Sequence, residues 1–318
     1  MGFLALSLCV GGRAASLPAQ TSPSGLPISG WPSAVALAGG GAVAWGDPTR
    51  SVEYPALAIG QLGSAVVAGF GTGAPSADLR SFRLGAVQML GKQRAASVTW
   101  TSREMTDLIE DPSVSDDGLR ISDWELRLGV AQRIGPLRAA LGLSAEYERS
   151  AVFSTRASKS SFGMSMLLEP TARTAFLFAV EGLGPSVRYR DADARERDKP
   201  QARRALASLG VMLADHQQYS GRLYIDYERG VSSEVFDRVS LAGEAILLGA
   251  FAARAGLTIR HDADAGSEWE RLYGLGFSLR VSAFELDCGF STGFNPDDLA
   301  PRQHFGFAWQ RRRSISPR

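Results

Sequence analysis

The chain has 318 residues, of which 45% are hydrophobic, and its 34 Lys and Arg against 33 Asp and Glu give a formal net charge of +1. This near-neutral balance provides no electrostatic footprint for nucleic acid, so we expect no nucleic-acid partner. Mean hydropathy is -0.05 and no apolar run approaches the length of a spanning helix, which excludes a helical membrane protein but not a β-barrel, where every second residue is polar.

The first residues have the pattern of an export signal. Phe3 to Val10 form an apolar stretch, small residues follow, and a cleavage site fits after Ala19. We therefore predict a signal peptide over residues 1–19. The alternative is an apolar N-terminus that belongs to the fold. A Pro-, Ser- and Gly-rich linker is expected from Gln20 to about Ile28.

The next stretch, residues 31–58, lacks strand alternation and is dense in Gly, Ala and Pro. Gly39, Gly41 and Ala44 fit a variant of the dinucleotide fingerprint. However, no strand precedes them, no crossover helix follows, and the later chain has no βαβ rhythm. Glycines that allow tight backbone packing are the better interpretation, so no cofactor is predicted.

The following residues are dominated by segments in which apolar and polar side chains alternate. Leu275, Phe277 and Leu279 lie on one side of a predicted hairpin, and Gly276 and Ser278 lie on the other. In a soluble sandwich the apolar face would meet a second sheet, whereas in a membrane barrel it meets lipid. We count about fourteen such segments, near residues 64–71, 80–90, 95–103, 123–133, 137–149, 159–168, 173–180, 202–214, 219–229, 238–248, 251–260, 269–281, 284–292 and 303–310.

The connections between these segments alternate between longer and shorter ones. The longer ones include an acidic loop at 104–122, a medium loop at 150–158 and the longest loop at 181–201. The shorter ones include residues 91–94 and 134–136. Outer-membrane barrels have long loops outside and short turns on the periplasmic side, and a soluble β-sandwich has no reason to keep this asymmetry.

We therefore predict an all-β fold, a closed antiparallel transmembrane β-barrel of about 14 strands with an N-terminal plug segment inside the lumen. The linker and plug are expected over residues 20–63, the barrel over 64–310 and a basic tail over 311–318. Such a barrel belongs in the outer membrane of a Gram-negative-type (diderm) bacterium.

A spanning barrel also predicts where charged side chains lie. Those on the polar register of the strands should face the lumen, because a charge facing lipid is costly. The predicted lumen charges are Arg127, Glu146, Asp226, Glu228, Glu244, Arg254, Glu285 and Asp287, with Arg83 and Glu125 on the same register.

Three stretches resemble the PorV/PorQ family of FadL-like outer-membrane barrels. They are ALAGGGAVAWGDPTRSVEYPAL at 36–57, GLGP at 182–185 and PRQHFGFAW at 301–309. In that family the N-terminal segment is expected to pack inside the barrel as a hatch. Members act either as a shuttle that accepts cargo in type IX secretion or as FadL-type channels for hydrophobic compounds.

The hatch motifs match the family in part. Residues 39–44 match its glycine-rich run, Asp47 matches its acidic turn, and Pro55 keeps the centre of its WNPAGL-type motif, while Tyr54 stands where the family has Asn. The resemblance thus implies contacts between plug and lumen at Gly39, Gly40, Gly41, Asp47, Tyr54 and Pro55.

From this resemblance we predict a non-catalytic barrel of the PorV/PorQ type that acts in transport or as a type IX secretion accessory. The alternative is a FadL-like channel for the uptake of small hydrophobic compounds. Outer-membrane lipids, lipopolysaccharide and secretion components or cargo are the expected partners, and the barrel is expected to be a monomer. The charged loop at 188–199 is either a solvated surface or a binding surface for partners or lipopolysaccharide.

Catalytic and metal-binding motifs are not found in the sequence. It has no HExxH, no paired cysteines, no calcium ladder and no GxSxG elbow, and His216, His261 and His304 lie in separate turns and strands. We predict no metal site and no enzyme. An outer-membrane lipid hydrolase that pairs His304 with Ser278 or Ser291 is the less favoured alternative.

Overall fold

The structure is a computed structural model. The predicted signal peptide, the linker and Gly39 lie outside the residues that it describes, as do residues 313–318 of the predicted tail. The described residues are 31, 37–38, 40–44, 46–60, 63–72, 78–106, 121–135, 138–152, 155–190, 196–201, 203–216, 218–230, 237–261, 269–293 and 302–312. None of the helices in these ranges is long and apolar enough to cross a membrane.

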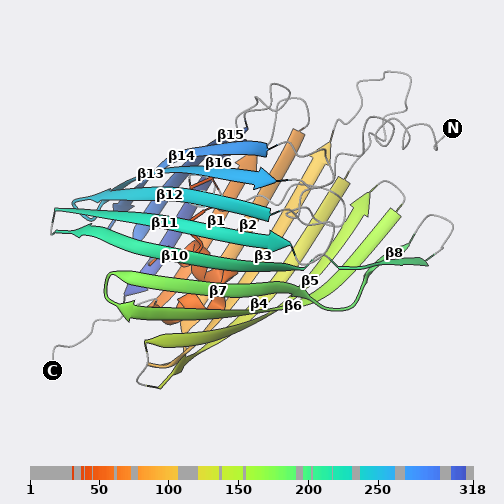
Figure 1. Cartoon of the computed structure of the whole chain (residues 1–318). Helices are drawn as coiled ribbons and strands as arrows, with labels where there is room; N and C mark the ends of the chain where they lie inside the picture. Colours follow the sequence, from red (N-terminus) through yellow and green to blue (C-terminus); the bar gives the residue numbers. More distant parts are fainter. Residues whose placement is uncertain are drawn as a thin grey trace.

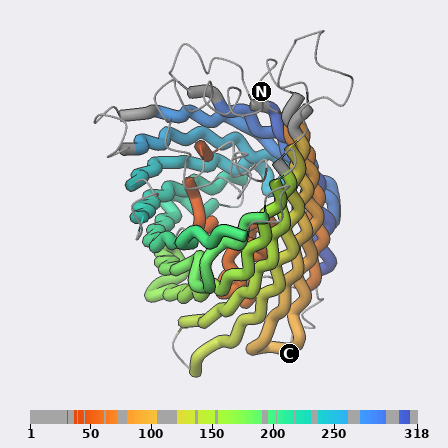
Figure 2. Tube along the Cα trace, turned by 90° about the vertical axis from the view of Figure 1, so that its right-hand side faces the viewer, coloured from red at the N-terminus to blue at the C-terminus, as the bar shows by residue number. Residues whose placement is uncertain are grey.

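Fourteen antiparallel strands close into a ring, which confirms the predicted fold. The first strand pairs with the last, and the ring closes where β5 pairs with β6 (Figures 1 and 2). A closed sheet leaves no unpaired edge in lipid. The ring consists of β1 (Gly63–Thr72), β2 (Asp78–Met89), β3 (Arg94–Thr106), β4 (Ile121–Ile134), β5 (Ala139–Val152), β6 (Thr155–Thr171), β7 (Thr174–Leu183), β10 (Arg204–Asp215), β11 (Tyr219–Gly230), β12 (Asp237–Leu247), β13 (Phe251–His261), β14 (Trp269–Val281), β15 (Phe284–Gly293) and β16 (Arg302–Arg312).

The two ends of the barrel differ as the connection lengths predict. Short turns such as 172–173 and 282–283 gather at one end, where β16 also finishes, and we call this the turn end. The longer connections gather at the opposite end, the loop end (Figure 1). In an outer-membrane barrel the turn end faces the periplasm and the loop end faces the outside.

Two predicted connections are wrong in extent. The predicted loop at 150–158 is mostly strand, because β5 continues to Val152 and β6 begins at Thr155. The outer face carries Arg149 and Arg156 there, so the apolar alternation that marks a strand disappears although the backbone pairing continues. The predicted loop at 181–201 contains a hairpin, β8 (Val187–Arg190) and β9 (Glu196–Lys199), in which β8 pairs with β6.

Burial in this protein is inverted relative to a soluble sheet. The apolar side chains of the alternating register are exposed, with Leu275 at 63% and Phe162 at 58%, whereas the charged register is buried, with Glu148 at 2%. A soluble protein would lose stability from such an arrangement, but a barrel in hydrocarbon gains from it. The outer face is therefore the lipid-facing surface.

A short N-terminal segment fills the lumen (Figure 2). It contains α3 (Pro48–Glu53) and the 3-10 helix η1 (Pro55–Gly60). Asp47 caps α3 by accepting hydrogen bonds from the backbone N–H of Thr49 at 2.8 Å and from its hydroxyl at 2.6 Å. Pro48, at the first helical position, has no N–H that would need a partner. The buried apolar residues of this N-terminal segment form one core cluster with wall residues such as Leu177 and Leu206.

The inverted burial leads to a test of the lipid-facing surface. Leu275 lies in the middle of β14, so Leu275→Arg should lower the free energy of unfolding in lipid vesicles by about 2–4 kcal/mol, because the charge enters the centre of the bilayer. Leu248→Arg is the matched control at an exposed position in a turn-end connection, where the loss should be about 0–1 kcal/mol. Denaturant titration of the refolded proteins measures both. Equal losses for the two variants would mean that Leu275 does not face hydrocarbon.

Candidate functional site

Polar side chains of the barrel wall satisfy the exposed backbone of the plug. Asp226 accepts a hydrogen bond from the Ala42 N–H at 2.9 Å, and Ser165 accepts one from the Ala56 N–H at 3.2 Å. The hydroxyl of Thr258 donates to the Ala38 carbonyl at 2.5 Å. Because α3 and η1 are short and leave backbone groups of the plug unpaired, these wall residues supply the missing partners and fix its position.

Glycines on the inner face of the wall make room for the plug. A Cβ on Gly142 of β5 would lie 2.4 Å from the Ala56 nitrogen, and one on Gly129 of β4 would lie 2.5 Å from the Pro55 ring. Any larger residue would push the plug out of its seat. The plug and the wall are therefore complementary in shape at η1.

One carboxylate of the plug ties α3 to the wall. Glu53 lies 3.1 Å from the Arg83 guanidinium on β2 and 3.0 Å from Arg50 within the plug. Its backbone carbonyl accepts a hydrogen bond from Arg127 of β4 at 3.2 Å. Glu53 thus holds the end of α3 between two strands that are not neighbours.

On the loop-end side of the plug, buried charges form a continuous chain of ion pairs around the wall, which we call the loop-end network. Arg103, whose side chain is only 1% exposed, lies 2.9 Å from Glu148, and Lys159 lies 3.3 Å from Glu148 and 2.9 Å from Glu146. Arg127 continues the chain by contacting Glu146 at 2.6 Å. The full set is Arg103, Asp123, Glu125, Arg127, Glu146, Glu148, Lys159, Glu181, Arg204, Glu228 and Arg238.

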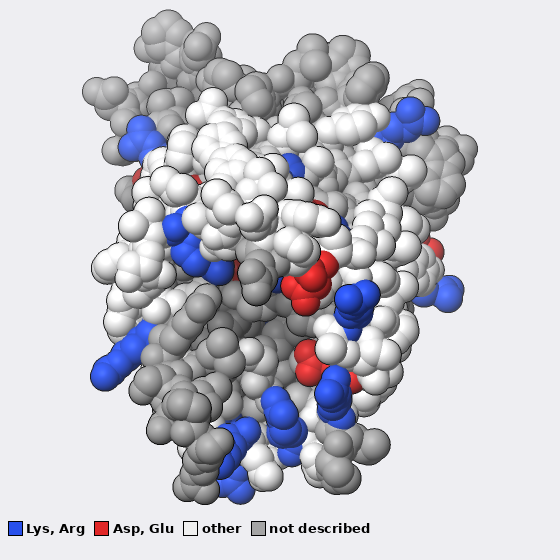
Figure 3. Space-filling view, turned by 90° about the vertical axis from the view of Figure 1, so that its left-hand side faces the viewer, with Lys and Arg blue, Asp and Glu red and all other residues white. Residues whose placement is uncertain are grey.

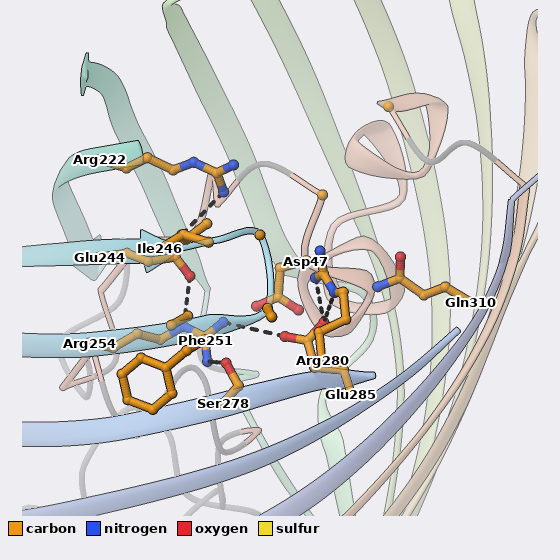
Figure 4. A pocket seen from close by; sticks show the side chains of 15 residues that line it. Asp47, Arg222, Glu244, Ile246, Phe251, Arg254, Ser278, Arg280, Glu285 and Gln310 are labelled. Atoms are coloured by element: carbon orange, nitrogen blue, oxygen red, sulfur yellow. Dashed lines mark hydrogen bonds and ion pairs between the residues drawn. The ribbon is translucent and has the colours of Figure 1, made fainter. Parts of the chain in front are cut away.

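On the turn-end side, the plug and the wall line a partly open cavity of about 220 Å³. Figure 3 looks onto this end of the barrel, which is hollowed between the strand ends and carries acidic and basic side chains at its rim. Figure 4 shows Arg254 at the centre of the charged lining. Arg254 lies 2.8 Å from Glu244, 2.9 Å from Asp287 and 3.6 Å from Glu285. The labelled lining residues are Asp47, Arg222, Glu244, Ile246, Phe251, Arg254, Ser278, Arg280, Glu285 and Gln310.

The structure brings the described plug residues of the predicted site to the wall. Gly40 packs against Ser240, Gly41 (φ 72°) against Tyr224 and Pro55 against Gly129, while Asp47 lines the cavity. Burial, and then the negative charge of Glu181, raises the pKa of the Tyr54 phenol, so this group stays neutral beside the ion pairs. Gly39 lies outside the described residues.

The predicted lumen charges all lie on the inner face, but in three separate places. Arg127, Glu146 and Glu228 belong to the loop-end network, and Asp226 binds the plug backbone. The others, at the turn-end cavity, are Glu244, Arg254, Glu285 and Asp287.

Several members of the loop-end network were not among the predicted lumen charges. Lys159 and Arg238 are the first residues of the predicted strands 159–168 and 238–248, and Glu181 lies one residue beyond the predicted strand 173–180, where a connection was expected. Each continues the inner register of its strand. Following the polar alternation to the loop end of each strand would have identified them.

The residues proposed for a hydrolase are only partly brought together. His304 lies on β16 and Ser278 on β14, so β15 separates them, and Ser278 instead accepts a hydrogen bond from Arg254 at 2.7 Å. Ser291 lies on β15, whose Gly289 is opposite His304 in the register. The Ser278–His304 pair is therefore wrong, because the two side chains lie on strands that are not neighbours.

The glycine seats make a prediction for the plug. Gly142→Ala should lower the free energy of unfolding by about 1–3 kcal/mol, because the added methyl collides with the backbone of η1. Gly221→Ala on β11 is the control, since a Cβ there has nothing closer than 4.0 Å. Limited proteolysis of the N-terminal segment and denaturant titration both report the change. An unchanged G142A protein would show that the plug does not sit against β5.

The ion pairs make a second prediction. Arg127→Met should destabilise the folded barrel by about 3 kcal/mol, because Glu146 and Glu181 each lose one buried partner while keeping Lys159 and Arg204. Arg133→Met, at an exposed position of the same strand, should change stability by less than about 0.5 kcal/mol. Thermal unfolding in detergent compares the two. A loss as small as that of R133M would remove Arg127 from the network.

Comparison with known proteins adds evidence on the fold. No protein-family model matches the chain, and no curated protein matches its sequence closely. The CymD monoaromatic hydrocarbon channel matches in structure with a TM-score of 0.67 at 13% identity, over 90% of this chain and 98% of that one. A Pseudomonas aeruginosa FadL homologue matches at 0.58 and 11% identity over 88% and 97%, and the Ralstonia pickettii toluene transporter TbuX at 0.58 and 11% over 89% and 98%.

At these identities the likeness is one of fold. It does not confirm the finer assignment to the PorV/PorQ family. The chain has the fold of a FadL-like 14-strand outer-membrane β-barrel, which places it in the outer membrane of a diderm bacterium.

Proposed function

We propose that this protein is a non-catalytic outer-membrane channel for the uptake of small hydrophobic compounds. The observation that carries the proposal is a plug that is held in the lumen by noncovalent contacts and leaves a cavity of about 220 Å³ against the wall at the turn end. Barrels of the same fold include a monoaromatic hydrocarbon channel and a toluene transporter. The sequence resemblance to the PorV/PorQ family of FadL-like barrels supports the same function, because FadL-type channels are among the members of that family.

The contact between plug and wall supports a hydrophobic solute. Val43, Leu57 and Ile59 of the plug share one apolar cluster with wall residues of β6, β7 and β10. We call this contact between plug and wall the apolar seam. A small apolar molecule that enters the apolar seam replaces apolar contacts between side chains with apolar contacts of its own, so the free-energy cost of its entry is small. Polar solutes meet the apolar seam and lose their hydration there.

The charged residues on both sides of the plug then have a simple role. The loop-end network and the cavity lining are already paired within the wall, so a passing apolar molecule breaks no ion pair. The ion pair of Glu53 with Arg83 differs from these wall pairs, because it joins the plug to the wall. We infer that the Glu53 contacts hold the plug in its closed position and that release of α3 widens the seam toward the cavity.

A type IX secretion accessory of the PorV/PorQ kind is the other function that the sequence predicts. It would accept folded cargo at the loop end and would not need a route past the plug. Deletion of the gene separates the two functions, because a cargo shuttle leaves secreted proteins stranded in the periplasm, while a channel leaves secretion intact and slows uptake.

The plug contact of Glu53 gives the direct test. Cells of a diderm host that produce the protein should take up radiolabelled toluene faster than cells with an empty vector, and Glu53→Gln should raise both this uptake and the ion conductance in planar bilayers. Asp215→Asn, at an exposed end of β10, is the matched control and should leave both unchanged. Uptake no faster than the empty vector would overturn the channel function. Unchanged conductance of E53Q would overturn only the role of Glu53.

A further inference from the structure

The outer face of the barrel between β4 and β8 changes its chemistry in steps along the membrane normal. Residues that are opposite one another in the strand register share a face and form rows across the strands, about 7 Å apart. The lowest row of interest contains Leu128, Ala145 and Phe162, and the next contains Leu126, Tyr147 and Ser160. The next two rows toward the loop end are Trp124, Arg149, Ser158 and Arg188, and then Ser122, Ala151, Arg156 and Arg190.

These rows pass from apolar to aromatic to cationic side chains. Phe162 is 58% exposed and belongs to the lipid-facing surface, and the Trp124 and Tyr147 rings are in contact, with centroids 5.3 Å apart. Such aromatic pairs mark the boundary between hydrocarbon and polar headgroups. The arginine rows therefore lie at the level of the headgroups of the outer leaflet.

We propose that Arg149, Arg156, Arg188 and Arg190 form a binding site for the phosphate groups of the outer-leaflet lipid, lipopolysaccharide. All four side chains are exposed on the outer face. Within the described part of the chain, none of the four makes an ion pair with a carboxylate. The site extends the wall beyond the hydrocarbon through the β8–β9 hairpin, which projects from the loop end near β6 (Figure 1).

The register gives a physical reason for an anion at this place. Arg156 and Arg190 are direct cross-strand partners, and Arg149 and Arg188 flank Ser158 from the two sides. Like charges directly opposite each other destabilise a strand pair. A phosphate between them removes the repulsion and accepts hydrogen bonds from both guanidiniums, which match its geometry.

The carboxylates nearby do not complete this neutralisation. Asp198 and Glu196 lie opposite Arg188 and Arg190 on β9, at the outer edge of the hairpin. Arg149 and Arg156 lie on the other side, on the ring strands β5 and β6, and keep the surplus of positive charge. The inner face of this part of the sheet is different, because Val187 of β8 and Ala157 of β6 are buried there. The cationic surface is thus confined to the side that meets lipid.

The test uses the full chain in detergent, purified lipopolysaccharide as ligand, and dephosphorylated lipopolysaccharide and inorganic phosphate as comparison ligands. The double variant R156Q/R190Q should bind lipopolysaccharide about 10- to 30-fold more weakly than the unaltered protein, since each arginine near an anionic surface contributes to affinity. R156K/R190K should retain more affinity than R156Q/R190Q, because it keeps the charge. R229Q/R271Q is the matched control, with two isolated exposed arginines on the outer face near the loop end of β11 and β14.

Three outcomes would overturn the proposal. They are equal affinity of R156Q/R190Q and the unaltered protein, equal affinity of the unaltered protein for dephosphorylated lipopolysaccharide, and full displacement of lipopolysaccharide by inorganic phosphate, which would identify a site for the free anion. Heat-modifiable migration of each unboiled variant on a detergent gel verifies the fold, and the exposed positions of these residues predict that it is preserved.

Discussion

A polar interior that water cannot freely solvate is the constraint on which the rest of this structure depends. The lipid takes the apolar face of every strand, so the charged register has to find its partners inside the ring. The loop-end network and the cavity lining solve this by pairing charges across the inner face, as Arg127 of β4 does with Glu146 on the adjacent β5 and with Glu181 on β7. These wall charges are consequently held in ion pairs within the protein itself.

The plug follows from the same constraint. A ring of this size leaves a lumen wider than its own side chains fill, and the N-terminal segment fills it with small residues. Its backbone would be unsatisfied in an apolar environment, yet Asp226, Ser165 and Thr258 supply hydrogen bonds from the wall. Polar contacts fix the position of the plug, while the apolar seam beside β7 and β10 lets one hydrophobic group replace another. The proposed channel function requires those two properties together.

The loop end shows how one strand serves two environments. Along β6 the outer register passes from Phe162 through Ser160 and Ser158 to Arg156, so a single alternation carries the wall from hydrocarbon into the headgroup layer. The β8–β9 hairpin widens the sheet only above that boundary, where unpaired backbone can reach water or headgroups. A sheet edge is tolerated there and would be costly a few residues lower.

Much of the barrel could be predicted from the sequence because apolar, lipid-facing residues alternate with polar, lumen-facing residues along each strand. The alternation of Leu275, Phe277 and Leu279 with Gly276 and Ser278 already determines a β-strand with one apolar face. The alternating connection lengths determine which end of the barrel faces the periplasm. This alternation is lost where the outer face no longer meets hydrocarbon, because the outward residues there are also polar. The ends of β5 and β6 and the hairpin after β7 therefore could not be placed. The sequence by itself determined the fold class, the inward direction of charges such as Arg254, and a compact segment before the first strand. Only the tertiary structure decided which charges pair, that Gly142 and Gly129 receive η1, and that Arg156 meets Arg190, because these contacts join residues far apart in the chain and depend on strand register and ring closure.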